Sequence, residues 1–126
     1  MRFVVIVLSC LFVMAASPAF ACKCAADTDG SLAAKVLADP SISVMDVYVR
    51  GVSMANHQSM LDLKNRHSGN LMAQNIRAKF GSSSCAVVPR YKQTMTVLIK
   101  AEDDATYSIV GDCEHSAVIK HLNKGQ

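Results

Sequence analysis

The sequence predicts a mainly β protein with flanking helices, a small five-stranded barrel clamped by disulfide bonds. Five short segments carry the apolar alternation or the β-branched and aromatic residues typical of strands. The first of these segments is long and contains Gly51, as expected of a bulged and strongly coiled barrel strand. Four cysteines remain once a targeting segment is removed, and an even number of cysteines in a small exported chain indicates disulfides.

The first 21 residues have the features of a secretory signal peptide. Arg2 supplies the positive charge, an apolar run extends to residue 16, and Ala19-Phe20-Ala21 forms the small-x-small cleavage pattern. The apolar run is short for a membrane span, so we expect export to the periplasm or the exterior without stable membrane insertion. Residues 22–126 then form one domain of about 105 residues, enough for a single modest core.

Two helices and five strands are expected in this domain. The helices are predicted at 31–38, with Ser31 as the N-cap and Asp39-Pro40 as the stop, and at 114–123. The strands are predicted at 43–54, 58–65, 71–80, 94–101 and 107–110.

The second and third strands are separated by a hairpin turn signal, His67-Ser68-Gly69-Asn70, and the last two by the acidic residues 102–104. Helix competes with strand over 71–80 because Leu, Met, Ala and Gln tolerate it. Five short strands, a bulged first strand and connecting helices fit a partly open Greek-key barrel of the OB type.

The four mature cysteines allow three disulfide pairings. Cys22 and Cys24 are separated by one residue, and a bond between them would close a very small, strained ring. Two orders remain, in which these cysteines reach Cys85 and Cys113. Each loop would enclose roughly 60 to 90 residues, for which the chain-entropy model gives about 4 to 5 kcal/mol per bridge.

The cysteines and strands together resemble the netrin-like domain family, which includes the N-terminal domain of the tissue inhibitors of metalloproteinases. That family begins its mature chain with Cys-x-Cys, followed by a strand of the form D-V-V-F-x-G-x-V, a mid-chain cysteine, a hairpin, and a cysteine before a closing helix. The counterparts here are Cys22-Lys23-Cys24, the segment Met-Asp-Val-Tyr-Val-Arg-Gly-Val at 45–52, Cys85, the hairpin of 94–110, and Cys113. The resemblance implies the pairing Cys22–Cys85 and Cys24–Cys113.

The resemblance also implies a function. In the inhibitors, the free amine and carbonyl of the first cysteine chelate the catalytic zinc of the protease, and the next residue enters its specificity pocket. This implies an inhibitory edge at Cys22 and Lys23, with a zinc metalloprotease as the protein partner. Lys23 departs from the pattern of the inhibitors. Its charge would have to be desolvated in a hydrophobic specificity pocket, which is unfavourable. The alternative is a purely structural interaction domain, in which the cysteines only form stabilising disulfides and Lys23 is exposed to solvent.

The spacing Met54-x-x-His57-x-x-Met60 is a second candidate site. Thioether and imidazole ligands suit copper in an exported protein, which would make this a periplasmic copper-handling protein. Against that, methionines commonly fill cores, and a strand does not place a three-residue spacing on one face.

Charge and composition disfavour other function classes. Without Arg2, the 13 basic side chains fall to 12 against 10 acidic ones, a net charge of about +2 that does not indicate nucleic acid. A set of basic residues could line a groove of the barrel, but it lacks the aromatic platforms that single-stranded nucleic acid requires. This basic set comprises Lys64, Arg66, Arg77, Lys79, Arg90, Lys92 and Lys100.

No enzyme and no cofactor are predicted, because the serines at 82–84 have no nucleophile-elbow or general-base pattern around them. A lipid anchor at Cys22 is an alternative fate for the mature N-terminus. It would acylate the amine and abolish zinc chelation, but Ala19 and Phe20 are poor matches to the residues that usually precede a lipidated cysteine.

Overall fold

The computed structural model describes Cys24 and residues 29–124. The predicted signal peptide at 1–21, together with Cys22 and Lys23, lies outside the described residues. The described chain contains five strands and two α-helices. They are α1 (Ser31–Ala38), β1 (Ile42–Ser53), β2 (Gln58–Ser68), β3 (Asn75–Lys79), β4 (Thr94–Ala101), β5 (Tyr107–Ile109) and α2 (Asp112–Lys124), with the 3-10 turn η1 (Asp103–Ala105) between β4 and β5.

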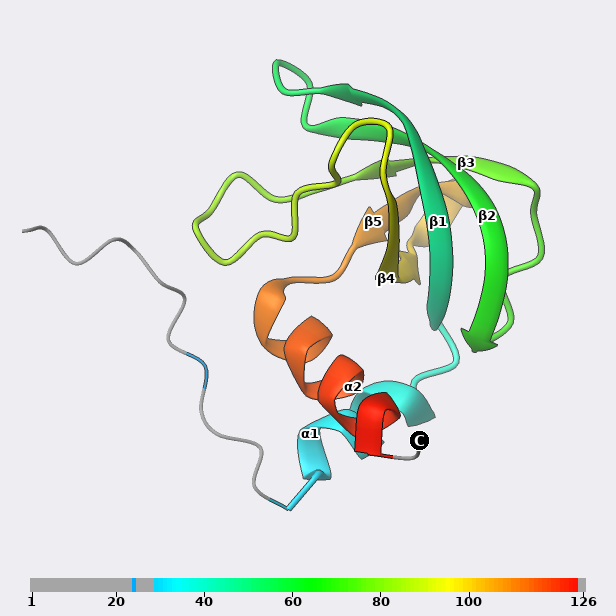
Figure 1. Ribbon diagram of the computed structural model, residues 1–126. Coiled ribbons are helices and arrows are strands. Elements are labelled where there is room, and N and C mark those ends of the chain that lie inside the picture. The colour runs from blue at the N-terminus through cyan, green and yellow to red at the C-terminus, as the bar shows by residue number, and fades with distance from the viewer. Residues whose placement is uncertain (1–23, 25–28, 125–126) are drawn as a thin grey trace, which may run out of the picture.

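The strands form a closed barrel in the order β1-β2-β3-β5-β4, and the helices lie together outside one end of it (Figure 1). β1 is antiparallel to both β2 and β4. β3 and β5 are parallel and pair through two residue pairs only, Ala78 with Tyr107 and Lys79 with Ser108. The predicted five-stranded barrel with flanking helices is confirmed. It was expected to be partly open, which is wrong, because the short β3–β5 seam closes it.

The predicted bulge in the first strand is confirmed. The β1–β2 register shifts between Val49 and Gly51, so Arg50 has no opposite residue on β2. Arg50 instead extends along the outer surface, where its Nη2 lies 2.8 Å from Oδ2 of Asp62. The extra residue increases local twist, and a strand of this length must bend to serve a small barrel.

Two apolar clusters stabilise the fold, one on each side of β1 and β4. The barrel interior is filled by side chains from all five strands, including Met45, Val47, Val49, Leu61 and Val97. The second cluster joins the outer face of β1 and β4 to the two helices through Ile42, Val44, Leu98, Ala33, Val36, Ala117 and Val118. Alternation along a strand explains the division, because neighbouring residues point to opposite faces of the sheet.

Strand β3 is shorter than predicted and begins at Asn75 rather than at residue 71. The predicted alternation holds at Ile76, Ala78 and Phe80, which are buried. It is wrong at Met72, which is 86% exposed. Residue 71 is not paired in the β2–β3 ladder, and the Leu71 N–H instead donates a hydrogen bond of 3.0 Å to Ser43 Oγ on β1.

The predicted turn at 67–70 is partly wrong, since β2 continues through His67 to Ser68. Gly69 then turns the chain with φ of 95°, a conformation that favours glycine. Two further details differ from the predictions. Gly30, not Ser31, is the N-cap of α1, and α2 begins at Asp112, so Cys113 lies in its first turn.

Candidate functional site

The described start of the domain is fixed to the N-terminus of α2. Cys24 and Cys113 form a disulfide with a Cα–Cα distance of 5.2 Å across a sequence separation of 89. This confirms one of the two pairings that the resemblance implies. The bond places Cys24 beside the loop that joins β5 to α2.

Cys85 belongs to the same region. Its carbonyl oxygen accepts a hydrogen bond of 2.7 Å from the N–H of Asp112, the residue before Cys113. Cys85 is itself disulfide-bonded. The predicted Cys22–Cys85 bond involves a residue outside the described ones and stays a prediction. The structure nevertheless brings Cys85 next to Cys113, as two bridges from cysteines one residue apart require.

The loop that carries Cys85, residues 81–93, is attached to β1 at its far end. Val49 donates its N–H to the Gln93 carbonyl and accepts the Lys92 N–H, both at 2.9 Å. The loop exposes Val88 and Tyr91, two large apolar side chains, to solvent. We call Cys24, this loop and the first turn of α2 the cysteine edge. It combines a base tied by a disulfide and backbone hydrogen bonds with two exposed apolar side chains.

The structure places Met54 and His57 in the turn between β1 and β2 and Met60 on β2. Met54 and Met60 are 60% and 46% exposed, so neither fills the core as the structural alternative supposed. The His57 ring packs edge-to-face on Phe80 at 5.6 Å, and its buried Nδ1 has no hydrogen-bond partner. Among the described residues, no group of three or more His, Cys, Asp or Glu side chains gathers as a metal site.

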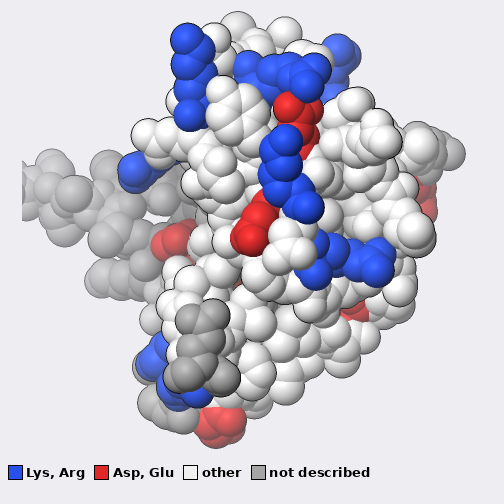
Figure 2. All heavy atoms as spheres, turned by 45° about the vertical axis from the view of Figure 1, so that its right-hand side comes forward, with Lys and Arg blue, Asp and Glu red and all other residues white. Residues whose placement is uncertain are grey.

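The basic side chains do not form a single-sign groove on the face of Figure 2, where lysine and arginine alternate with acidic residues. Arg50 is paired with Asp62, and Arg66 Nη1 donates to the carbonyl of Leu71 at 3.3 Å. Lys92 lies over the ring of its neighbour Tyr91. These contacts are those of a mixed, solvated surface, and the absence of a nucleic-acid partner stays a prediction.

A polar network crosses the outer face of β1, β2 and β4. Asp46 on β1 accepts a hydrogen bond from the Thr96 hydroxyl of β4, and the same oxygen lies 2.9 Å from His67 Nε2 on β2. Burial works to raise the pKa of Asp46, but bonds from Thr96, His67 and Asn65 outweigh it and hold the pKa below its usual value. The network ties three strands together through one carboxylate.

Removing the Thr96 hydroxyl should reveal how much the hydrogen bond to Asp46 contributes to the stability of the fold. A carboxyl whose pKa is lowered by folding adds stability at neutral pH that is lost as the pH falls through its folded pKa. We therefore expect Thr96→Val to lower the free energy of unfolding by about 1 kcal/mol at pH 7. This loss of stability should become smaller at pH values below 3.8, the usual pKa of an Asp carboxyl. Urea unfolding at pH 7 and pH 2.5 measures it. Thr94→Val, an exposed change on the same strand, is the control and should cost less at both pH values.

Two other groups, one carboxyl and one imidazole, have shifted pKa values. Hydrogen bonds from the hydroxyl and the N–H of Ser41 lower the pKa of Asp39 and form the turn that ends α1. Burial lowers the pKa of His115 on α2 despite the nearby Asp112, and its Nδ1 has no hydrogen-bond partner. Both groups lie at helix ends, and Asp39 has a clear structural role there.

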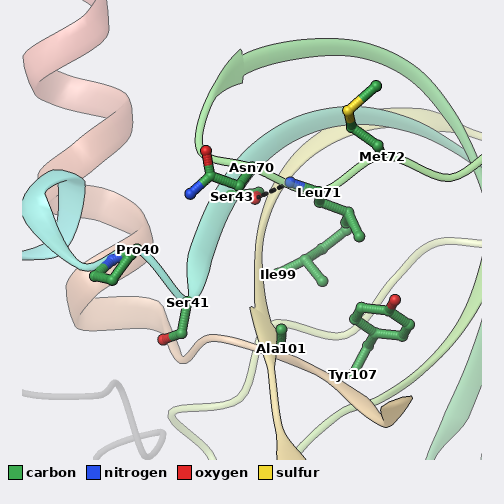
Figure 3. A pocket seen from close by; sticks show the side chains of 9 residues that line it. All are labelled: Pro40, Ser41, Ser43, Asn70, Leu71, Met72, Ile99, Ala101 and Tyr107. Carbon is green, nitrogen blue, oxygen red and sulfur yellow. Dashed lines mark hydrogen bonds between the residues drawn. The ribbon is translucent and has the colours of Figure 1, made fainter.

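A cavity of about 330 Å³ opens where the chain leaves β2 (Figure 3). It is bounded by the residues before β1, the 70–72 segment and the β4–β5 hairpin. Its lining consists of Pro40, Ser41, Ser43, Asn70, Leu71, Met72, Ile99, Ala101 and Tyr107. Sequence reasoning missed this site because it assigned 71–80 to a continuous strand. The available sequence signal was Ser43, a polar residue between Ile42 and Val44 in the predicted first strand; the structure shows that it is buried.

Within the described residues, no helix is both long enough and apolar enough to cross a membrane. Comparison with known proteins finds no match among family models, curated proteins or solved structures. The chain is therefore described by its fold alone, a five-stranded mixed β-barrel with a Cys24–Cys113 disulfide.

Proposed function

We propose that this protein is an exported binding module that engages a protein partner through its cysteine edge. The observation that carries the proposal is the meeting of three distant segments at the first turn of α2. Cys24 is bonded to Cys113, and the Cys85 carbonyl is bonded to the N–H of Asp112. A segment held in this way loses little conformational entropy when it binds, which favours tight association.

The sharper form of the proposal is inhibition of a zinc metalloprotease. If cleavage follows Ala21, Cys22 becomes the first residue, and its free amine and carbonyl are suited to fill the open position of a catalytic zinc. Lys23 would then enter the specificity pocket. Because desolvating a cation in an apolar pocket is unfavourable, the preferred target is a protease whose pocket is acidic or open to water.

N-terminal sequencing and the intact mass of the exported protein test the first requirement. A mature chain that begins with an unmodified Cys22 supports the inhibitor proposal, and an acylated or extended N-terminus contradicts it. The same measurement reports the predicted signal cleavage, the lipid-anchor alternative and the export prediction.

The identity of residue 23 should select the target. We expect Lys23→Val to strengthen inhibition of a zinc endopeptidase with an apolar specificity pocket roughly ten- to a hundred-fold, because the charge no longer has to be desolvated. It should weaken inhibition of one with an acidic pocket. Inhibition constants against both enzymes measure the effect. Lys64→Val, an exposed substitution on β2, is the control. Equal constants for all three proteins would contradict a role for residue 23.

A second candidate function is copper binding at Met54, His57 and Met60. The observation that favours it is the exposure of both thioethers beside a turn that contains an imidazole. Soft thioether ligands prefer Cu(I). Titration with Cu(I) in competition with a chelator should reveal a site tighter than micromolar that Met54→Leu and Met60→Leu weaken. Met72→Leu, at a still more exposed methionine, is the control. Unchanged affinity in the first two variants contradicts this function.

A further inference from the structure

We propose that the cavity at the end of the β3–β5 seam binds a small, uncharged and mainly apolar molecule that carries one hydroxyl or carbonyl group. The site is separate from the cysteine edge in its residues and from the function proposed above. The argument depends on how the cavity arises, what lines it and which polar groups are open in it.

The cavity follows from the topology of the barrel. The seam between β3 and β5 begins only at Ala78 and Tyr107. Before β3 begins, the 70–72 segment runs past the β4–β5 hairpin instead of pairing with it, and the cavity lies between them. Ile99, whose side chain belongs to the barrel core, lines the opening. A ligand in the cavity would therefore lie against the edge of the barrel core, since Ile99 is only 1% exposed, without any displacement of a strand.

The edge of the opening is held in place by the start of β1. Ser43, which is 3% exposed, accepts the Leu71 N–H through its Oγ, the bond drawn in Figure 3. Gly69 turns directly against the backbone of the same serine. A site held by such contacts is largely formed before a ligand arrives, which is typical of small-molecule pockets.

The dimensions indicate the size of the ligand. The volume of about 330 Å³ lies at the lower end of the range for ligand pockets, roughly 300 to 1,000 Å³. It is also about twice the roughly 150 Å³ of an apolar protein cavity that accommodates benzene. A bicyclic aromatic compound or a medium-length aliphatic chain matches this size.

The lining indicates the chemistry of the ligand. Leu71, Ile99 and the ring of Tyr107 provide an apolar wall, and the described lining contains no charged side chain. An ionised ligand would therefore lose hydration without gaining a counter-charge. Met72 stands at the mouth, and its flexible thioether side chain can adapt to different ligand shapes.

Two polar groups at the opening are available to orient a ligand. Within the described part of the chain, the Tyr107 hydroxyl and the Asn70 amide make no hydrogen bond to protein, whereas Ser41 and Ser43 are already engaged. In Figure 3 the Tyr107 hydroxyl points toward the side of the cavity where Leu71 and Met72 lie. One hydroxyl or carbonyl group on the ligand would satisfy either of them, which explains the predicted amphipathic character.

The test is an NMR titration of the isotope-labelled mature domain with 2-naphthol, compared with 2-naphthoate, which is ionised at neutral pH. We expect 2-naphthol to shift the methyl signals of Leu71, Ile99 and Ala101 saturably, with a Kd of about 1 mM or below. We expect no saturable shift from 2-naphthoate. Shifts that are unsaturable, spread over the whole surface or equal for both compounds would overturn the proposal.

Substitutions separate the cavity from non-specific binding. Ala101→Phe should fill the mouth and weaken 2-naphthol binding at least ten-fold, while Thr94→Phe, on the same strand but outside the cavity, should leave it unchanged. Tyr107→Phe, which keeps the ring, should weaken binding about two- to ten-fold through loss of one hydrogen bond. Unchanged affinity in a folded Ala101→Phe protein would overturn the proposed site. Unchanged affinity in Tyr107→Phe would overturn the proposed polar contact.

Discussion

Replacing Cys24 and Cys113 together by serine should lower the free energy of unfolding by about 4 to 5 kcal/mol, the value that the chain-entropy model assigns to a loop of this length. The disulfide spans 89 residues, almost the whole of the described domain. A domain of this size is expected to be stable by only about 5 to 15 kcal/mol, so the bond accounts for a large share of its stability.

Urea unfolding monitored by far-UV circular dichroism measures this effect. The slope of the free energy against urea should also rise, because the unfolded chain expands once the cross-link is gone. Ala86→Ser, beside Cys85, controls for the introduction of a serine. A double variant that loses less than about 1 kcal/mol would contradict the assigned role of the bond.

Gly69→Ala should lower the free energy of unfolding by about 2 to 4 kcal/mol, through backbone strain and steric overlap together. The φ of Gly69 is 95°, which a side chain disfavours. A Cβ at this position would lie 2.5 Å from Ser43 Cα and 2.7 Å from the Ile42 carbonyl oxygen. Backbone atoms cannot move aside as a flexible side chain can, so β1 or the 69–72 turn must shift.

Gly30→Ala is a matched control for this variant. Gly30 also has a positive φ, 73°, but nothing lies within 4 Å of an added Cβ. Gly30→Ala should therefore lower the free energy of unfolding only through the unfavourable backbone conformation, by about 1 kcal/mol. Thermal or urea unfolding of the two variants compares them directly. Equal losses would show that close packing against Ser43 contributes nothing.

The strands were predictable from sequence wherever one face is continuously buried. β4 and α1 have the predicted bounds, and β1 differs by one residue at each end, because apolar periodicity and clear stop signals delimit them. The bulge at Gly51 was also predictable, since an internal glycine in a long strand has few other uses.

The 69–74 segment was not predictable by the same reasoning. Leu71 and Met72 continue an apolar pattern, yet only Leu71 packs on the core, and Met72 is exposed. The deciding interaction is the hydrogen bond from Leu71 to Ser43, two residues far apart in sequence. Local pattern carries no information about such a contact, so both the end of β2 and the cavity were missed.

The cysteine edge was predictable in part. Spacing alone left two pairings, and the resemblance implied the one that contains Cys24–Cys113, the bond that the structure shows. Its second bond, Cys22–Cys85, stays a prediction. The exposed Val88 and Tyr91 were not singled out, because the 81–93 loop has no periodicity to interpret. The resemblance concerned cysteine positions and strand order, and those are properties of the fold rather than of a binding surface.

The two-pair seam between β3 and β5 has a consequence for motion. Barrel closure there depends on far fewer hydrogen bonds than the β1–β2 and β1–β4 ladders, so the seam is the place where the ring opens with least loss of free energy. Such an opening separates Tyr107 from β3 and leaves β1, β2 and β4 paired. We therefore expect local opening to widen the barrel beside its cavity while β1, β2 and β4 stay paired.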